Sequence, residues 1–132
     1  MLNLEIVTPE KKVLSEAVDS VTIPTASGEV GILQNHAPLI SSLRSGILSY
    51  TRGSATERMV VAGGFVEVSQ NNVSILADTA ETAAEINVDS ARAERETLER
   101  ELGAWKGSVE EFEIEKERLE KAQARLQLAS GK

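Results

Sequence analysis

The feature that most constrains this chain is an abrupt change of composition at residues 85–93. Every proline lies before this segment, where short β-branched runs are separated by Gly, Asn and Ser, a pattern typical of strands and turns. After it there is no proline, and Glu, Ala, Leu, Arg and Lys dominate, which favours helix. The sequence therefore predicts a β-rich head over residues 1–84 and a helical tail over residues 85–132.

The head is predicted to be an N-terminal antiparallel β-sandwich, which makes the whole chain an α+β protein. Leu2, Leu4 and Ile6 alternate with polar residues, the period of a half-buried strand. Pro24 is expected to end the ladder of its strand, because it has no amide donor. Short strands at regular spacing are typical of a sandwich or barrel, and they are expected at residues 2–6, 13–18, 19–24, 40–43, 47–51, 59–62, 65–68 and 73–77.

The tail is predicted to be a hairpin of two antiparallel helices, at about residues 89–105 and 109–129. Asp89 suits the N-cap of the first helix, and Gly107 suits a left-handed cap at its end. Ser108 begins a capping box, Ser-Val-Glu-Glu, at the start of the second helix. The second helix is expected to bury one apolar stripe, made of Val109, Phe112, Leu119, Ala122, Leu126 and Ala129.

Such narrow stripes do not stabilise a helix hairpin by themselves. They must pack on each other, on the head or on a partner. The turn at Gly107 is also weak enough to straighten into a long probe. Two alternatives follow from the tail sequence, namely a permanently docked hairpin and a hairpin that switches between a folded and an extended state.

Composition excludes several classes of partner. The net charge is −7 and the charges of the tail are mixed in sign, so no nucleic-acid partner is expected. No apolar run approaches about 18 residues, so no direct membrane insertion is expected. The N-terminal residues show no basic leader, so we expect neither a signal peptide nor a transit peptide. The chain has no cysteine, which excludes disulfides and thiolate metal sites.

Few residues suggest catalysis. His36 is the single histidine, and without a Ser, Asp or Cys partner at motif spacing it is interpreted as closing a turn by hydrogen bonding. Gly63-Gly64 lacks the Lys-Ser/Thr of a P-loop and precedes a strand, so it is interpreted as a kink or bulge. We predict no catalytic residue, no metal site and no required cofactor.

Four segments carry a family resemblance when they are taken together and in order. They are Gly28–Leu39 (GEVGILQNHAPL), Gly63–Val68 (GGFVEV), Asp78–Glu81 (DTAE) and Val88–Ala93 (VDSARA). With these motifs the chain resembles the ε subunit family of F-type ATP synthases over nearly its whole length. The resemblance implies a sandwich that binds the γ subunit and the c-ring. It also implies a hairpin that folds on the head or opens along γ toward the β subunits of the α3β3 hexamer.

The resemblance further implies a function without catalysis. The chain would be a rotor subunit of the central stalk that couples γ to the c-ring during proton-driven ATP synthesis and inhibits ATP hydrolysis through its mobile helices. It would lie peripherally on the cytoplasmic face of a bacterial membrane, or on a chloroplast thylakoid. The alternative is a stand-alone nucleotide-sensing protein with the same two parts.

In some relatives the folded hairpin binds ATP. The resemblance carries that site over to Val88, Asp89, Arg92, Ala93 and Arg125. Two further positions that hold Arg in binding relatives hold Glu99 and Lys121 here, and neither offers the bidentate fork of Arg. We therefore expect weak, millimolar-range ATP binding or none. The alternative is that the carboxylate and guanidinium of the VDSARA segment only cap and staple the helix start.

A basic row is predicted on the second helix. Arg118, Lys121 and Arg125 recur at i, i+3 and i+7, on one side of the helix. The resemblance implies that this row meets an acidic segment of the β subunit when the tail is extended. It is therefore the predicted partner-binding surface of the tail.

Overall fold

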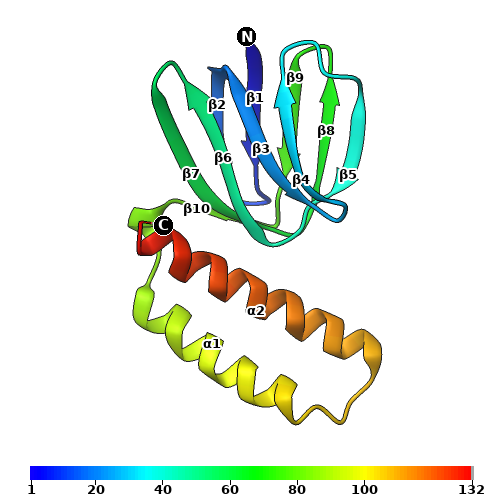
Figure 1. Cartoon of the computed structure of the whole chain (residues 1–132), viewed down its shortest axis with the longest axis vertical. Coiled ribbons are helices and arrows are strands. Elements are labelled where there is room, and N and C mark those ends of the chain that lie inside the picture. Colours follow the sequence, from blue (N-terminus) through cyan, green and yellow to red (C-terminus); the bar gives the residue numbers. More distant parts are fainter. Residues whose placement is uncertain (132) are drawn as a thin grey trace.

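The computed structural model describes residues 1–131 and shows a β-sandwich with a two-helix hairpin docked at one end (Figure 1). The strands are β1 (Leu2–Val7), β2 (Lys12–Val18), β3 (Ser20–Thr25), β4 (Gly28–Leu33), β5 (Leu39–Ser42), β6 (Gly46–Arg52), β7 (Ala55–Ala62), β8 (Phe65–Ser69), β9 (Asn72–Leu76) and β10 (Thr79–Glu81). The first sheet has the order β2-β1-β9-β8-β5 and the second has the order β10-β7-β6-β3-β4. The pairing is antiparallel except between β1 and β9. The predicted α+β class is confirmed.

Alternating side chains fill the space between the two sheets. In β1 the side chains of Leu2, Leu4 and Ile6 are buried, whereas Asn3 is exposed. Burying one such aliphatic side chain is worth about 1.5–3 kcal/mol. A register slip of one residue would turn the whole set toward water, so the pattern fixes the pairing. The largest fully buried side chains of the head are Leu2, Leu4, Ile6, Ile23, Ile32, Leu48 and Ile75.

Two strands were not expected from the sequence. β4 lies in a glycine-containing segment, and β10 has only 3 residues. Pro24 was predicted to end its ladder, and this is half wrong, because Pro24 pairs with Glu29 inside the β3–β4 ladder. The pairing of β3 with β6 ends at Thr22, before Pro24. The missing amide of Pro24 therefore interrupts no hydrogen bond between β3 and β6.

The Gly63-Gly64 turn has a backbone role. Gly64 has φ +87°, in the region that favours glycine, and a Cβ there would run into the carbonyl oxygen of Leu76. The turn brings β7 into β8, which switches the chain from the second sheet to the first. A side chain at this position would clash with the backbone, so the position favours glycine. This agrees with the predicted kink rather than with a phosphate cradle.

The tail begins with the short helix η1 (Ala83–Glu85), followed by α1 (Val88–Gly103) and α2 (Val109–Ala129). α2 lies between the sandwich and α1, and it contacts β6, β7 and η1 (Figure 1). The contact with the head is a small apolar cluster of Val60, Ile86, Ala124 and Leu128, with Ile47 and Ala129 partly buried against it. The stripe expected on α2 is therefore incomplete, because Ala124 and Leu128 form a second buried set and Val109 is 75% exposed.

The caps of the helices differ in part from the prediction. The N-cap of α1 is Asn87, whose side chain accepts a hydrogen bond from the Ser90 amide, while Asp89 lies within the first turn, where its charge interacts favourably with the helix dipole. Gly107 is not a left-handed cap, since α1 ends earlier, at Gly103 with Ala104 as C-cap. The predicted N-cap of α2 is confirmed, because Ser108 Oγ accepts from the Glu111 amide at 3.1 Å.

An aromatic contact closes the loop between the helices. Trp105 lies beyond the end of α1 and donates from Nε1 to the carbonyl oxygen of Ser108 at 3.0 Å. Its ring meets that of Phe112 edge-on, with centroids 5.9 Å apart. A side chain at Gly107 would press on the Trp105 ring, so the glycine makes room for the tryptophan rather than capping the helix.

Candidate functional site

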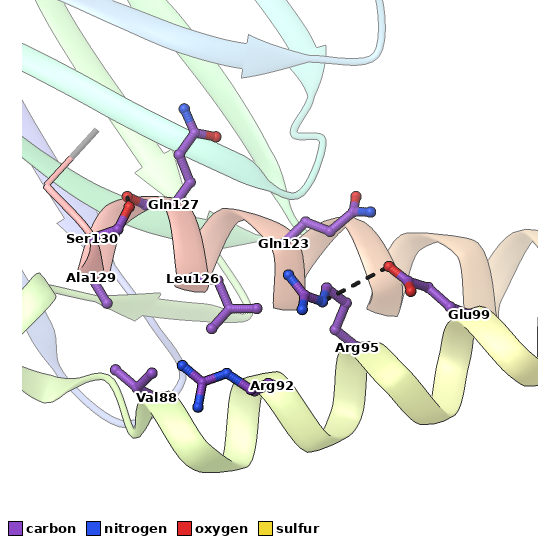
Figure 2. Close-up of a pocket in the computed structure, with 9 residues that line it drawn as sticks. All are labelled: Val88, Arg92, Arg95, Glu99, Gln123, Leu126, Gln127, Ala129 and Ser130. Carbon is purple, nitrogen blue, oxygen red and sulfur yellow. Dashed lines mark hydrogen bonds and ion pairs between the residues drawn. The ribbon is translucent and has the colours of Figure 1, made fainter.

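A groove lies between α1 and the C-terminal half of α2. It has a volume of about 730 Å³, within the range of small-molecule sites. Figure 2 shows Arg92 and Arg95 on α1, with Glu99 one turn further along, and the side chains of α2 on the other side of the groove. The lining residues are Val88, Arg92, Arg95, Glu99, Gln123, Leu126, Gln127, Ala129 and Ser130.

Three charged residues of α1 determine the electrostatics of this groove. Arg92, Arg95 and Glu99 recur at i, i+3 and i+7, so they share one face of the helix. Nε of Arg95 lies 3.8 Å from Oε1 of Glu99, and within residues 1–131 this buried Nε has no hydrogen-bond acceptor at ordinary distance. The groove thus offers two guanidinium groups to an anion, with one carboxylate at its edge.

The structure brings together only part of the predicted ATP site. Val88 and Arg92 line the groove. Asp89 is almost fully exposed and lies 3.7 Å from Nη1 of Arg92, so it holds this arginine from the side. Ala93 is exposed on α1 and does not line the groove. Arg125 points to the head instead, where its Nε lies 2.8 Å from Oε1 of Glu81.

Sequence reasoning missed Arg95. It follows Arg92 by about one helical turn, so the spacing already placed both residues on one face of the helix, and the structure shows that this face borders α2. Gln123 and Gln127 were missed for another reason. They recur at i and i+4 on α2, and nothing in the sequence alone distinguishes a solvent-facing glutamine from one that borders a groove.

The basic row of α2 is turned toward acidic groups of the same molecule. Arg118 contacts Glu115 at 3.2 Å and Glu94 of α1 at 3.7 Å. Arg125 contacts Glu81 of β10, as described above. Lys121 lines a polar recess with Arg125 between α2 and β10. In this docked arrangement the three side chains face the head and α1.

The remaining candidates have structural roles. His36 Nδ1 lies 2.6 Å from the carbonyl oxygen of Ala37, and the His36 amide donates to the Leu33 carbonyl at 3.1 Å, which agrees with the predicted turn-closing role.

Within residues 1–131 no cluster of His, Cys, Asp and Glu has the arrangement of a metal site. In the same range no helix is long and apolar enough to cross a bilayer.

Together these features define a class of protein, a β-sandwich that carries a docked two-helix arm with a cationic groove. The profile of the ATP synthase delta/epsilon chain β-sandwich domain matches residues 1–83. An ATP synthase epsilon chain of Desulfitobacterium hafniense is 47% identical over 104 residues, which are 79% of each chain. That of Syntrophobacter fumaroxidans is 46% identical over 128 residues, which are 97% of this chain and 95% of the relative.

A solved structure is similar over both parts of the chain. The mitochondrial ATP synthase of Euglena gracilis, determined by cryo-electron microscopy as OSCP, F1 and c-ring, contains a chain with a TM-score of 0.80 and 27% identity, covering 95% of this chain and 81% of that one. The present chain belongs to the ATP synthase epsilon chain family. This confirms the predicted function as an epsilon chain, a stalk subunit that is not itself catalytic.

Proposed function

We propose that this chain joins the γ subunit to the c-ring in the rotor of an F-type ATP synthase. The observation that carries the proposal is the similarity of the whole chain, head and tail, to a chain in a solved F1/c-ring assembly. The head supplies a rigid sandwich with a continuous aliphatic core, which suits a part that transmits torque. As part of that complex the chain lies peripherally, on the cytoplasmic face of a bacterial membrane.

Copurification tests this placement. A tagged chain expressed from its native locus is expected to retain a stoichiometric complex with the γ, β and c subunits after detergent extraction of the membrane. The matched control is a tagged tail, residues 85–132, without the head. Recovery of the full chain alone, free of these subunits, would favour the alternative, a stand-alone nucleotide-sensing protein.

The tail is proposed to inhibit ATP hydrolysis when it leaves the head. The support is the basic row of Arg118, Lys121 and Arg125, because three cations on one side of a helix complement an acidic segment of a β subunit. In the docked arrangement these side chains face the molecule itself. Docking and inhibition are therefore alternative uses of the same helix.

ATP is proposed to bind weakly to the groove between α1 and α2. Arg92 and Arg95 would meet the phosphates, while Glu99 repels them and Arg125 is engaged elsewhere. A ligand that binds only the folded hairpin adds about 1.4 kcal/mol to that state at tenfold above its dissociation constant. ATP would thus favour the docked tail only where the two states are nearly balanced.

A further inference from the structure

α2 is held on the head by a small apolar contact with an ion pair on each border. At one border Arg44, in the loop after β5, donates from Nε and Nη2 to the two carboxylate oxygens of Glu120, each at 2.7 Å. At the other border Nε of Arg125 lies 2.8 Å from Oε1 of Glu81 in β10. Within residues 1–131 these are the two ion pairs that join head and tail.

The surroundings of the two pairs favour a role in docking. Between them the apolar contact from α2 consists of the buried Ala124 and Leu128, with Ala129 partly buried. The side chains of Arg125 and Glu81 are only 13% and 23% exposed, so their attraction is weakly screened and loss of either partner leaves the other without its counter-charge. The Arg44–Glu120 pair is bidentate, the geometry in which arginine binds carboxylate most specifically.

Arg125 has two roles in this arrangement. It belongs to the basic row that the proposed function assigns to an acidic partner, yet in the docked state its guanidinium is engaged by Glu81. A carboxylate of the head thus contacts the cation that an acidic partner would need. A partner would therefore have to displace Glu81, or share a largely buried guanidinium with it, while α2 stays on the head.

We propose that Arg44–Glu120 and Glu81–Arg125 form an ion-pair latch, and that Glu81 is an internal competitor that withholds Arg125 from acidic partners until α2 leaves the head. The competitor role rests on the proposed function of the basic row. The latch does not, because it concerns only the isolated chain. The two halves are therefore tested separately.

The latch is tested by the distance between head and tail in the isolated full-length chain. Because the chain has no cysteine, Ser54→Cys in the β6–β7 turn and Lys106→Cys in the loop between the helices give two spin-label sites, both exposed. Double electron–electron resonance then reports the docked and released populations. The latch variants are Glu81→Gln and Arg44→Gln. The matched controls, Glu16→Gln and Arg52→Gln, break an ion pair that lies wholly within the head.

Glu81→Gln is expected to raise the ratio of released to docked tail about tenfold, the effect of losing one charge-assisted pair. Arg44→Gln is expected to raise it about two- to fivefold, because the Arg44 side chain is half-exposed. Raising the salt from about 0.05 M to about 0.5 M should release the wild-type tail more than the tail of the double variant, because salt screens the pairs. The two controls should match the wild type. Unchanged distances in both latch variants, or equal changes in the controls, would overturn the latch.

The competitor role is tested with a poly-glutamate peptide as the acidic partner. Compared with the wild type, Glu81→Gln should bind the peptide about tenfold more tightly and Arg44→Gln about two- to fivefold more tightly. Adding Arg125→Gln to either variant should remove that gain. Arg44→Gln makes the chain more acidic, so a simple charge effect predicts weaker binding, as for the control Arg52→Gln. Weaker or unchanged binding in Arg44→Gln, with the tail released, would refute the competitor role. Copurification of the full chain tests the proposed function independently.

Discussion

At the scale of single residues, the two arginines of the groove are the sharpest prediction. Arg92→Ala and Arg95→Ala should each abolish the chemical-shift changes that ATP produces at millimolar concentration, because each removes a guanidinium from the groove. Arg100→Ala, on the same helix but outside the groove, is the matched control. Titration of the isolated chain followed by NMR checks this. Equal loss in Arg100→Ala would place ATP elsewhere.

A second prediction at this scale concerns Gly64. Gly64→Ala should lower the free energy of unfolding by at least about 1–3 kcal/mol, since a Cβ is strained at φ +87° and collides with the Leu76 carbonyl. Gly31→Ala is the control, because φ there is ordinary and a Cβ meets nothing within 4 Å. Urea unfolding measures both. A Gly64→Ala chain as stable as Gly31→Ala would contradict the steric role of this turn.

At the scale of elements, the docking of α2 should depend on pH only in acid. The hydrogen bonds from Arg44, then its charge and that of Lys116, lower the pKa of Glu120 below the ordinary value of 4.5, against the effect of partial burial. Glu117 and Glu113 also lie near Arg44 and share its field. A lowered pKa means that the carboxylate contributes its full docking energy above pH 4.5 and loses it as the pH falls through the docked-state pKa.

The measurement is the released fraction of the spin-labelled chain between neutral and acidic pH. We expect no change from about pH 8 to about pH 6, and growing release below the ordinary glutamate pKa. Glu120→Gln should show more release at neutral pH and a smaller rise in acid. A wild-type tail that leaves the head between pH 8 and 6 would mean that a group other than Glu120 controls docking.

At the scale of the whole molecule, the head should fold without the tail. Its main core is continuous across both sheets and is made only of head residues, from Leu2 to Ala80. A chain of residues 1–84 should therefore unfold cooperatively and still bind γ, although it exposes Val60, which Ile86, Ala124 and Leu128 cover in the full chain. Thermal unfolding and γ pull-down check this. A non-cooperative transition would show that the hairpin is part of the head's core.

The basic row gives a prediction for the assembled enzyme. Replacing Arg118, Lys121 and Arg125 by Ala should raise the rate of ATP hydrolysis several-fold, because the released tail loses its attraction to an acidic segment. The matched control removes three exposed cations elsewhere, with Arg58, Arg100 and Lys106 changed to Ala. Hydrolysis rates are compared at equal subunit occupancy. Unchanged hydrolysis in the triple variant would remove the row from the inhibitory mechanism.

The sequence by itself determined the two-part architecture and most of its elements. Period-2 alternation in residues such as Leu2, Leu4 and Ile6 and helical periodicity in the tail are local properties, so they are visible without coordinates. The Ser108 cap was visible for the same reason. β4 and β10 were not visible, because β4 contains glycines and β10 is very short, so neither has a strong strand pattern of its own. Each is a strand because it pairs with a neighbour, β4 with β3 and β10 with β7.

Only the tertiary structure decided how the charged residues of the tail are used. Arg125 was assigned from the sequence both to ATP and to a partner, and Glu81, 44 residues away along the chain, engages it instead. Arg44 and Glu120 likewise meet across 76 residues. Period and propensity describe neighbours along the chain, whereas an ion pair between head and helix depends on how the two parts pack. For that physical reason the latch is absent from the sequence patterns and present in the fold.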